Sequence, residues 1–235
     1  MLAIEKLNQF YGESHTLWDL DLDVPAGQCT CVMGRNGVGK TTLMKAIMGE
    51  VAVKSGQLRY QGDGSEVELT KKAVEARSRL GIGFVPQGRQ IFPLLTVEEN
   101  LRTGLAARGD GLKKIPERIY ELFPVLKEMK HRRGGDLSGG QQQQLAIGRA
   151  LVIEPKLLIL DEPGEGIQPN IVAQIGQVIR QLIKEDGLTV LLVEQKLPFA
   201  RKYADRFVIM DRGRPVAKGD ISELSNELIK QHLTV

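Results

Sequence analysis

The chain has 235 residues, 42% of them hydrophobic and 26% charged, which is the composition of an ordinary globular protein that can bury a sizeable core. A formal net charge of +3 is too small at this length to indicate a nucleic-acid-binding protein, so we expect no nucleic-acid partner. No apolar run approaches the roughly 20 residues of a membrane-spanning helix, and the N-terminus lacks a secretion signal. We therefore expect a cytoplasmic protein, which would need another chain to span a membrane.

The first predicted elements are strands. Residues 19–24 alternate aspartate with leucine or valine, which is the period-two pattern of a half-exposed strand. Residues 28–33, "QCTCVM", predict a short buried strand in which Cys29 and Cys31 point to the same face. Cysteines at this spacing on an extended backbone cannot easily close a disulfide, so we expect two small core residues in a reducing compartment.

The buried strand runs into "GRNGVGKTT", which fits the phosphate-loop pattern G-x-x-x-x-G-K-[ST]. The glycines let successive backbone N–H groups point at a phosphate, the lysine reaches the β/γ oxygens, and the first threonine hydroxyl is a ligand for Mg²⁺. A helix is expected to follow and to end at Gly49. The predicted phosphate-binding residues are Gly34, Arg35, Asn36, Gly37, Val38, Gly39, Lys40, Thr41 and Thr42.

The middle of the chain, residues 88–137, shows no strand pattern. Thr96 and Glu99 have the spacing of a capping box that begins a helix, and the apolar residues of 116–123 lie on one face of a second helix. The predicted organisation is a single domain, 1–235, with an α/β core of residues 1–87 and 138–235 and an inserted helical subdomain of residues 88–137.

Two apolar segments after the insertion, "KLLILDEP" and "LTVLLVEQ", are typical of strands covered on both faces. The first ends in Asp161, at the edge where open α/β sheets bind ligands. There Asp161 would hold Mg²⁺ through water, and Glu162 would polarise an attacking water. A helix beginning at Pro169 and ending at Gly187 should separate the two strands, and "ISELSNELIKQHL" should form one terminal helix.

Residues 137–151, "LSGGQQQQLAIGRAL", raise a question. Their pattern indicates a helix that begins at Ser138, and such a helix start can bind an anion. The chain already has a phosphate loop, however, so a second phosphate-binding element needs an explanation. The alternative is a low-complexity glutamine run without chemistry.

The phosphate loop, "FVPQ", "LSGGQ" and "LLILDEP", in this order, resemble the nucleotide-binding domain of an ABC transporter, and the resemblance covers essentially the whole chain. It implies an α/β P-loop NTPase core with a mixed sheet, an antiparallel β edge at the N-terminus and an inserted helical subdomain. It also implies an ATPase that powers solute transport.

In this family two domains sandwich two ATP molecules, so the resemblance implies a homodimer or a heterodimer with a related ATPase subunit. The family's signature motif, here "LSGGQ", would contact the γ-phosphate held by the partner chain's loop. This would explain two phosphate-binding elements in one chain. The glutamines after the signature would then be solvated first turns of its helix. The signature residues are Leu137, Ser138, Gly139, Gly140 and Gln141.

The resemblance implies roles for further residues. Tyr11 stands where the family stacks an aromatic ring on adenine, although a surface tyrosine at a strand end is the alternative. Gln87 matches a loop glutamine that contacts Mg²⁺ and the attacking water. The implied metal set is Thr41, Gln87 and Asp161, and the implied catalytic set is Glu162, Gln87 and Gln195.

An apolar stretch lies in an apparent loop shortly after Gln87 and contains Ile91, Phe92, Leu94 and Leu95. The family docks a cytoplasmic helix of its integral-membrane permease subunits in this region. The resemblance therefore implies a peripheral protein on the cytoplasmic face of the cell membrane, with only indirect contact to an external solute-binding protein. The alternative is that the stretch fills the insertion's own core.

Two departures from the family pattern narrow the assignment. Gln195 stands where most members have a switch histidine, and its amide can donate a hydrogen bond but cannot carry charge. Gly164 replaces the usual threonine or serine. With "PQGRQIFPLLTVEENL" and "EGIQP", these residues resemble ATPase subunits of branched-chain amino acid, amide and urea importers, most closely the urea type. The alternatives are a soluble, non-transport ABC ATPase, or a weakly hydrolysing partner that lends its signature to another subunit.

Overall fold

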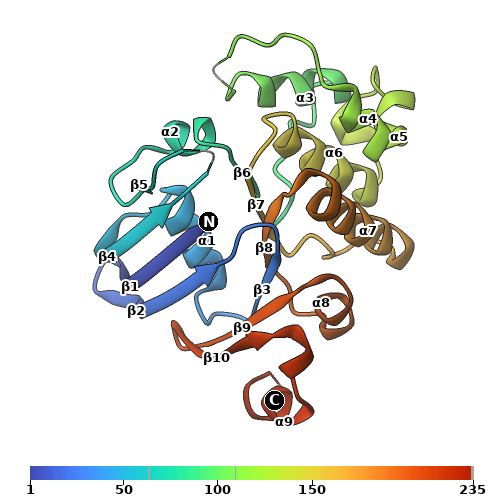
Figure 1. Ribbon diagram of the computed structural model, residues 1–235. Coiled ribbons are helices and arrows are strands. Elements are labelled where there is room, and N and C mark those ends of the chain that lie inside the picture. The colour runs from blue at the N-terminus through green and yellow to red at the C-terminus, as the bar shows by residue number, and fades with distance from the viewer. Residues whose placement is uncertain (63, 109, 234–235) are drawn as a thin grey trace.

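A six-stranded sheet forms the centre of the chain and has helices on both faces (Figure 1). This computed structural model describes residues 1–62, 64–108 and 110–233. In spatial order the strands are β10 (Arg214–Asp220), β9 (Arg206–Asp211), β3 (Cys29–Met33), β8 (Thr189–Val193), β7 (Leu157–Asp161) and β6 (Ile82–Val85). β10 is antiparallel to β9 and the other neighbours are parallel, so the sheet is mixed, as predicted.

The N-terminal strands were predicted as an antiparallel edge of the mixed sheet, but they form a second sheet of their own. Its strands in spatial order are β2 (Ser14–Val24), β1 (Leu2–Tyr11), β4 (Val53–Tyr60) and β5 (Val67–Glu68). Helix α1 (Lys40–Met48) shares one buried core with this sheet and with one face of the central sheet. The aspartates of β2 point to solvent while Leu20, Leu22 and Val24 are buried, so the alternating pattern covers one face only.

Strands β3, β7 and β8 are buried along their whole length, because both faces of the central sheet are covered. Successive residues of each strand therefore pack into different cores. Cys31 faces the core on the helical side, whereas Val32 faces the core around α1. Cys29 and Cys31 are both free and buried on the helical side, which confirms that they are small core residues.

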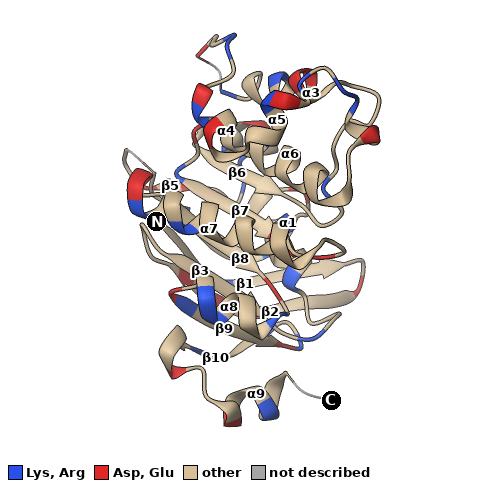
Figure 2. Cartoon of the chain, turned by 90° about the vertical axis from the view of Figure 1, so that its right-hand side faces the viewer, with Lys and Arg blue, Asp and Glu red and all other residues tan. Residues whose placement is uncertain are grey.

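The remaining helices lie mainly on the opposite face of the central sheet and above it in Figure 1. They are α2 (Val74–Arg79), α3 (Val97–Leu105), α4 (Glu117–Leu122), α5 (Pro124–Glu128), α6 (Gly139–Leu151), α7 (Pro169–Asp186), α8 (Leu197–Tyr203) and α9 (Asn226–His232), with 3₁₀ turns at Gly134–Asp136 and Ile221–Glu223. Figure 2 shows α7 lying across the sheet, with acidic and basic residues interspersed over the elements of this side. None of the helices in the described part of the chain combines the length and apolar character needed to cross a membrane.

The helix boundaries follow local signals. The backbone N–H of Glu99 donates to the Thr96 hydroxyl over 3.2 Å, and the Thr96 N–H donates to the Glu99 carboxylate over 2.7 Å, which confirms the predicted capping box of α3. Helix α1 ends at Gly49 and helix α7 ends at Gly187, each in the left-handed conformation, as predicted.

Two predictions about helices are wrong. Gln143 and Gln144 are buried rather than solvated, because α6 packs against α3 and α7, and the Gln144 amide donates to the Gln174 side chain over 2.9 Å. The terminal segment is not one helix. The Ser225 hydroxyl accepts the Leu228 N–H over 3.2 Å and so begins α9 as a separate helix after a 3₁₀ turn.

Arg77 in α2 is the largest fully buried side chain of the described residues, and it caps the end of α1. Its guanidinium donates to the carbonyl oxygens of Ala46 and Ile47 over 2.8 and 2.6 Å, and to that of Lys72 over 2.9 Å. Burial lowers the pKa of Arg77, but a cation at the C-terminal end of a helix is favourable. Arg77 therefore fixes the helix that follows the phosphate loop.

We expect Arg77→Ala to lower the free energy of unfolding by about 3–5 kcal/mol, because it removes the guanidinium donor from three carbonyls and opens a cavity, and of the three Ala46 keeps the Gly49 N–H. Arg77→Lys should recover only part of this loss, since lysine lacks the planar fork. Urea denaturation measures both. The matched control is exposed Arg79, whose replacement by alanine should change stability by less than about 0.5 kcal/mol. Equal losses at the two positions would contradict the capping role.

Candidate functional site

The loop between β3 and α1 has the geometry of a phosphate cradle. A Cβ atom at Gly34 would lie 2.5 Å from the carbonyl oxygen of Met210, so a larger residue does not fit. Gly39 precedes the first turn of α1 with a φ of 105° and provides no side-chain cap. The first N–H groups of α1 therefore have no side-chain acceptor at the helix start, where the helix dipole favours an anion.

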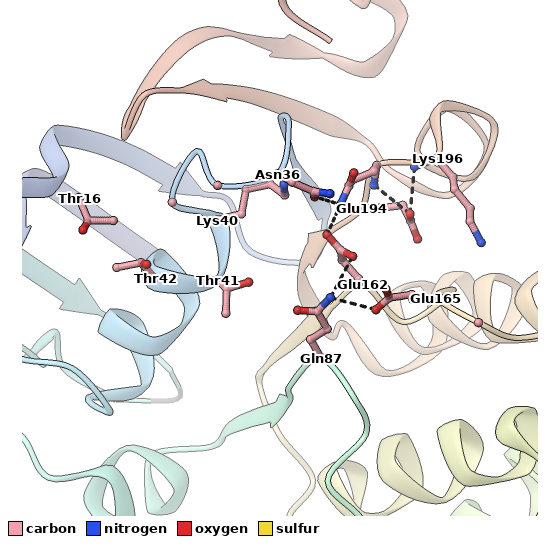
Figure 3. A pocket seen from close by; sticks show the side chains of 14 residues that line it. Thr16, Asn36, Lys40, Thr41, Thr42, Gln87, Glu162, Glu165, Glu194 and Lys196 are labelled. Atoms are coloured by element: carbon pink, nitrogen blue, oxygen red, sulfur yellow. Dashed lines mark hydrogen bonds between the residues drawn. The ribbon is translucent and has the colours of Figure 1, made fainter. Parts of the chain in front are cut away.

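A cavity of about 680 Å³ lies at the carboxyl ends of the central parallel strands, which is where α/β sheets bind ligands (Figure 3). It brings together most of the residues predicted for the phosphate site and all three predicted for catalysis. The predicted residues that line it are Asn36, Gly37, Gly39, Lys40, Thr41, Thr42, Gln87, Glu162 and Gln195. Gly34, Arg35, Val38 and Asp161 belong to the same loop and strand ends but do not line the cavity.

Lys40 is buried, with 5% of its surface exposed, and its side chain folds back onto the phosphate loop. Its Nζ donates to the carbonyl oxygens of Gly34 and Arg35 over 2.8 and 2.9 Å. Burial lowers the pKa of Lys40, and the nearby carboxylates of Glu162 and Asp161 oppose this effect. The site thus places one ammonium group close to two carboxylates, while the hydrogen bonds of Lys40 go to backbone carbonyls.

Asp161 ends β7 and is 2% exposed, and neither of its carboxylate oxygens has a hydrogen-bond partner among the described residues. Burial raises the pKa of Asp161 to about 6, and the adjacent Thr41 hydroxyl lowers it without making a hydrogen bond of normal geometry. Unsatisfied carboxylate oxygens beside a threonine hydroxyl fit a hard cation such as Mg²⁺, which prefers oxygen ligands. The described residues hold no cluster of three or more His, Cys, Asp or Glu for a metal, so nucleotide phosphates and water would complete the coordination.

Glu162 is held from two sides by glutamine amides. The Gln195 Nε2 donates to Glu162 Oε1 over 2.5 Å and to the Asn36 side chain over 2.8 Å. The Gln87 Nε2 donates to Glu165 over 2.9 Å and more weakly to Glu162 Oε2 over 3.4 Å. Glu162 has a φ of 51°, which is uncommon for a residue with a side chain and indicates a locally strained position. Figure 3 shows Gln87, Glu162 and Glu165 converging at the cavity.

The signature residues lie apart from this cavity, and none of residues 137–141 lines it. Ser138 caps α6, as its position predicted, and its N–H donates to the Gln141 side chain over 2.9 Å while the Gln141 N–H donates to the Ser138 hydroxyl over 3.4 Å. The two bonds form a capping box, which rules out an unstructured glutamine run.

Tyr11 is the last residue of β1, is 48% exposed and does not line the cavity. Beside it lies an exposed aromatic stack that the sequence analysis missed. The His15 ring lies between those of Phe10 and Trp18, with centroids 4.0 and 3.6 Å apart, and the Arg214 guanidinium lies 5.3 Å from the Trp18 ring. No spacing rule predicts this stack, because it forms across a hairpin with irregular register.

The apolar stretch after Gln87 is divided between core and surface. Phe92 and Leu94 are 48% and 79% exposed, whereas Ile91 packs against the core and Leu95 is half-buried. The stretch is thus partly core and partly surface, and its role in docking stays a prediction.

Several cavity residues were not predicted: Thr16, Glu165, Gly166, Glu194 and Lys196. Glu194 and Lys196 flank Gln195 directly after a buried strand, and that position at the carboxyl end of β8 was an available signal. Thr16 comes from β2, and its approach to the cavity depends on the packing of the two sheets.

Comparisons with known proteins agree with this geometry. The profile of the ABC transporter family matches residues 17–165, more than half of the chain, so the chain belongs to the ABC transporter family. The high-affinity branched-chain amino acid transport ATP-binding protein BraG of Pseudomonas aeruginosa is 43% identical, over 92% of this chain and 91% of its own. The probable branched-chain amino acid transport ATP-binding protein LivF of Archaeoglobus fulgidus is 38% identical, over 95% and 94%.

Among solved structures, the ATP-binding cassette MJ0796 in a dimeric post-hydrolysis state bound to ADP and Pi matches with a TM-score of 0.84. It is 25% identical and the match covers 94% of this chain and 99% of that chain. The predicted fold class is confirmed, and the chain is an ATP-binding subunit and an ATPase coupled to transport.

In the metal-free chain, we expect Asp161→Asn to raise the free energy of unfolding at pH 8 by up to about 3 kcal/mol. The pKa of Asp161 rises from 3.8 to about 6, so its carboxylate destabilises the fold above that range and asparagine removes the charge. The gain should shrink as the pH falls below about 6 and vanish near pH 4. Urea denaturation in the presence of a chelator measures it. A gain independent of pH would contradict the assigned cause.

Proposed function

We propose that this chain binds Mg–ATP in the cavity and hydrolyses it to drive an importer of branched-chain amino acids, amides or urea, at the cytoplasmic face of the cell membrane. The observation that carries the proposal is the convergence of Gln87 and Gln195 on Glu162 beside the phosphate loop. This arrangement gives a general base that hydrogen bonds orient toward the position of a γ-phosphate.

The phosphate loop would bind the nucleotide through backbone N–H groups and Lys40. The Lys40 Nζ, which donates to loop carbonyls in this structure, would turn to the β/γ oxygens. Thr41, Gln87 and Asp161 would hold Mg²⁺, which supplies charge neutralisation on the phosphates. Tyr11 would contact the adenine from the end of β1.

Glu162 would accept the proton of the attacking water. Its two oxygens accept hydrogen bonds from Gln195 and Gln87, so the carboxylate is fixed in orientation before the substrate arrives. Gln195 stays neutral throughout and contributes a hydrogen bond rather than a charge. This favours slow hydrolysis, so a weakly hydrolysing partner subunit is the second candidate function.

A second chain would complete the site. Residues 137–141 do not line this chain's own cavity, and the capping box uses the Gln141 N–H while the earlier N–H groups of α6 remain for a ligand. We infer that these groups bind the γ-phosphate held by a second copy or by a related ATPase subunit. The dimeric state of the solved cassette MJ0796 supports this arrangement.

Permease subunits would dock beside Phe92 and Leu94. A hollow of about 860 Å³ next to Phe92 is bounded by residues of α2, α3 and α6, and the Arg149 guanidinium lies 5.2 Å from the Phe92 ring. An exposed aromatic at the rim of a hollow suits a partner helix. The external solute-binding protein would act on this chain only through the permease.

The names of two relatives bear on the transported solute. Both relatives described above are named for branched-chain amino acid transport, which favours that solute over urea. The urea-type assignment, based on "EGIQP" and the Glu-Gln pair, stays a prediction. Titration of the cognate external binding protein with leucine and with urea would decide between them, and co-purification with permeases rather than ribosomes or DNA would exclude a soluble role.

We expect Glu162→Gln to keep ATP binding and to lower the ATPase rate by about 10²–10⁴-fold, because the amide cannot accept the proton. Gln195→Ala should cost about tenfold at most, the value of one neutral hydrogen bond. ATPase rates and ATP affinities of both variants measure this. Wild-type turnover in Glu162→Gln would exclude Glu162 as the base, and complete loss in Gln195→Ala would mean that Gln195 does the work of the missing histidine.

The shared-site arrangement predicts complementation between two inactive variants. Lys40→Ala removes the phosphate cation and Ser138→Arg blocks the start of α6, so each alone should be inactive. An equimolar mixture should recover up to about a quarter of the activity, because half of the dimers are mixed and each has one intact site. If the native partner is a related subunit, Ser138→Arg should instead stop hydrolysis at that partner's phosphate loop. Unchanged hydrolysis there would exclude the shared site.

A further inference from the structure

Glu194, directly after β8, has an unusual environment for a carboxylate. It is 3% exposed, and only Asp161 is comparably buried among the described aspartates and glutamates. No ion pair of the described residues includes it, because the neighbouring Lys196 Nζ donates instead to the carbonyl oxygen of Gly164 over 2.7 Å. The charge of Lys196 is near enough to act on the Glu194 carboxylate but makes no ion pair with it. A buried carboxylate without an ion pair is costly unless hydrogen bonds compensate, so the partners of its two oxygens matter.

The first oxygen of Glu194 holds the chain on either side of a catalytic side chain. Oε1 accepts the backbone N–H groups of Gln195 and Lys196, each over 2.9 Å. These bonds fix the two residues that precede α8. The Gln195 amide then reaches Glu162 over 2.5 Å and Asn36 over 2.8 Å. The Glu194 carboxyl thus sets the position from which Gln195 contacts the base.

The second oxygen, Oε2, has no hydrogen-bond partner among the described residues. A Cβ atom at Gly164 would lie 3.2 Å from it and 3.4 Å from the nearest Val172 methyl group, so a small side chain would fit only in close contact, with the Glu194 carboxylate shifted slightly. Gly164 is also outside the left-handed region, so an L-residue meets no backbone strain there. A serine hydroxyl at this position would donate to Oε2, and glycine removes that donor.

We propose that Glu194 is a positioning residue for ATP hydrolysis, which holds Gln195 against Glu162 through one oxygen while Gly164 leaves its other oxygen unsatisfied. The inference rests on the proposed roles of Glu162 and Gln195. Glycine at position 164, where the family usually has threonine or serine, would therefore hold Glu194, and through it Gln195, less firmly.

The kinetic test uses three variants of the full chain, with kcat and KM for ATP measured separately. Glu194→Ala should lower kcat by up to about tenfold, the loss expected for Gln195→Ala, and change KM less than about twofold, because the phosphate loop is untouched. Glu194→Gln should restore most of that loss, since its amide oxygen can still accept both N–H groups. Glu194→Asp keeps the charge but is one methylene shorter, and should behave like Glu194→Ala.

A second test needs no ATP. Gly164→Ser should melt about 2–4 °C above Gly164→Ala, because the two variants share the same Cβ and differ by one hydroxyl donor to Oε2. In a Glu194→Ala background this difference should disappear, which completes a double-mutant cycle. Gly164→Ser should also raise kcat relative to Gly164→Ala.

The outcomes separate this inference from the proposed function. Glu194→Ala at the wild-type rate, or Glu194→Gln as slow as Glu194→Ala, would overturn the positioning role. Equal melting temperatures of Gly164→Ser and Gly164→Ala would overturn the unsatisfied oxygen, even if Glu194→Ala fails to fold. Turnover in Glu162→Gln would instead overturn the catalytic assignment of the proposed function and leave the melting comparison standing.

Discussion

The register of three parallel strands is the constraint on which the site depends. Val193 of β8 pairs with Val32 of β3 on one side and with Asp161 of β7 on the other. The phosphate loop, Glu162 and Gln195 each begin one or two residues beyond this row, so they emerge together at one edge of the sheet. A slip of one residue in any of these strands would turn its side chains toward the opposite core and move the predicted catalytic groups apart.

The same edge of the sheet holds several groups whose environments lower the stability of the fold. Asp161 and Glu194 are buried with unsatisfied oxygens, Lys40 is buried against loop carbonyls, and Glu162 has a left-handed backbone. Each lowers the stability of the nucleotide-free chain, and the proposed Mg–ATP would provide partners for those that face the cavity. This distribution is typical of a site that trades stability for function. The apolar cores on both faces of the sheet provide the stability that offsets these costs.

Under the proposed function, the separation of the signature from the cavity accounts for the two predicted phosphate-binding elements in one chain. Helix α6 is fixed by its contacts with α3 and α7, and its buried glutamines are part of that packing. The start of α6 therefore cannot move to the chain's own phosphate loop without breaking a core. In the proposed dimer a second chain would present the same helix start, so each chain alone would lack part of the site.

The sequence by itself determined the elements whose signals are local. The phosphate loop, the capping boxes at Thr96 and the start at Ser138, and the left-handed helix ends at Gly49 and Gly187 follow from neighbouring residues, and so does the pair of buried strands that end in polar residues. The resemblance to ABC transporter nucleotide-binding domains then indicated how these motifs belong to one fold. Features that depend on distant segments were decided by the tertiary structure alone: the burial of Gln143 and Gln144, the Phe10–His15–Trp18 stack and the approach of Glu194 to Gly164. The physical reason is the sequence separation of the interacting residues. A capping hydrogen bond joins residues within about four positions, whereas two side chains from distant segments come into contact only when the whole sheet has formed.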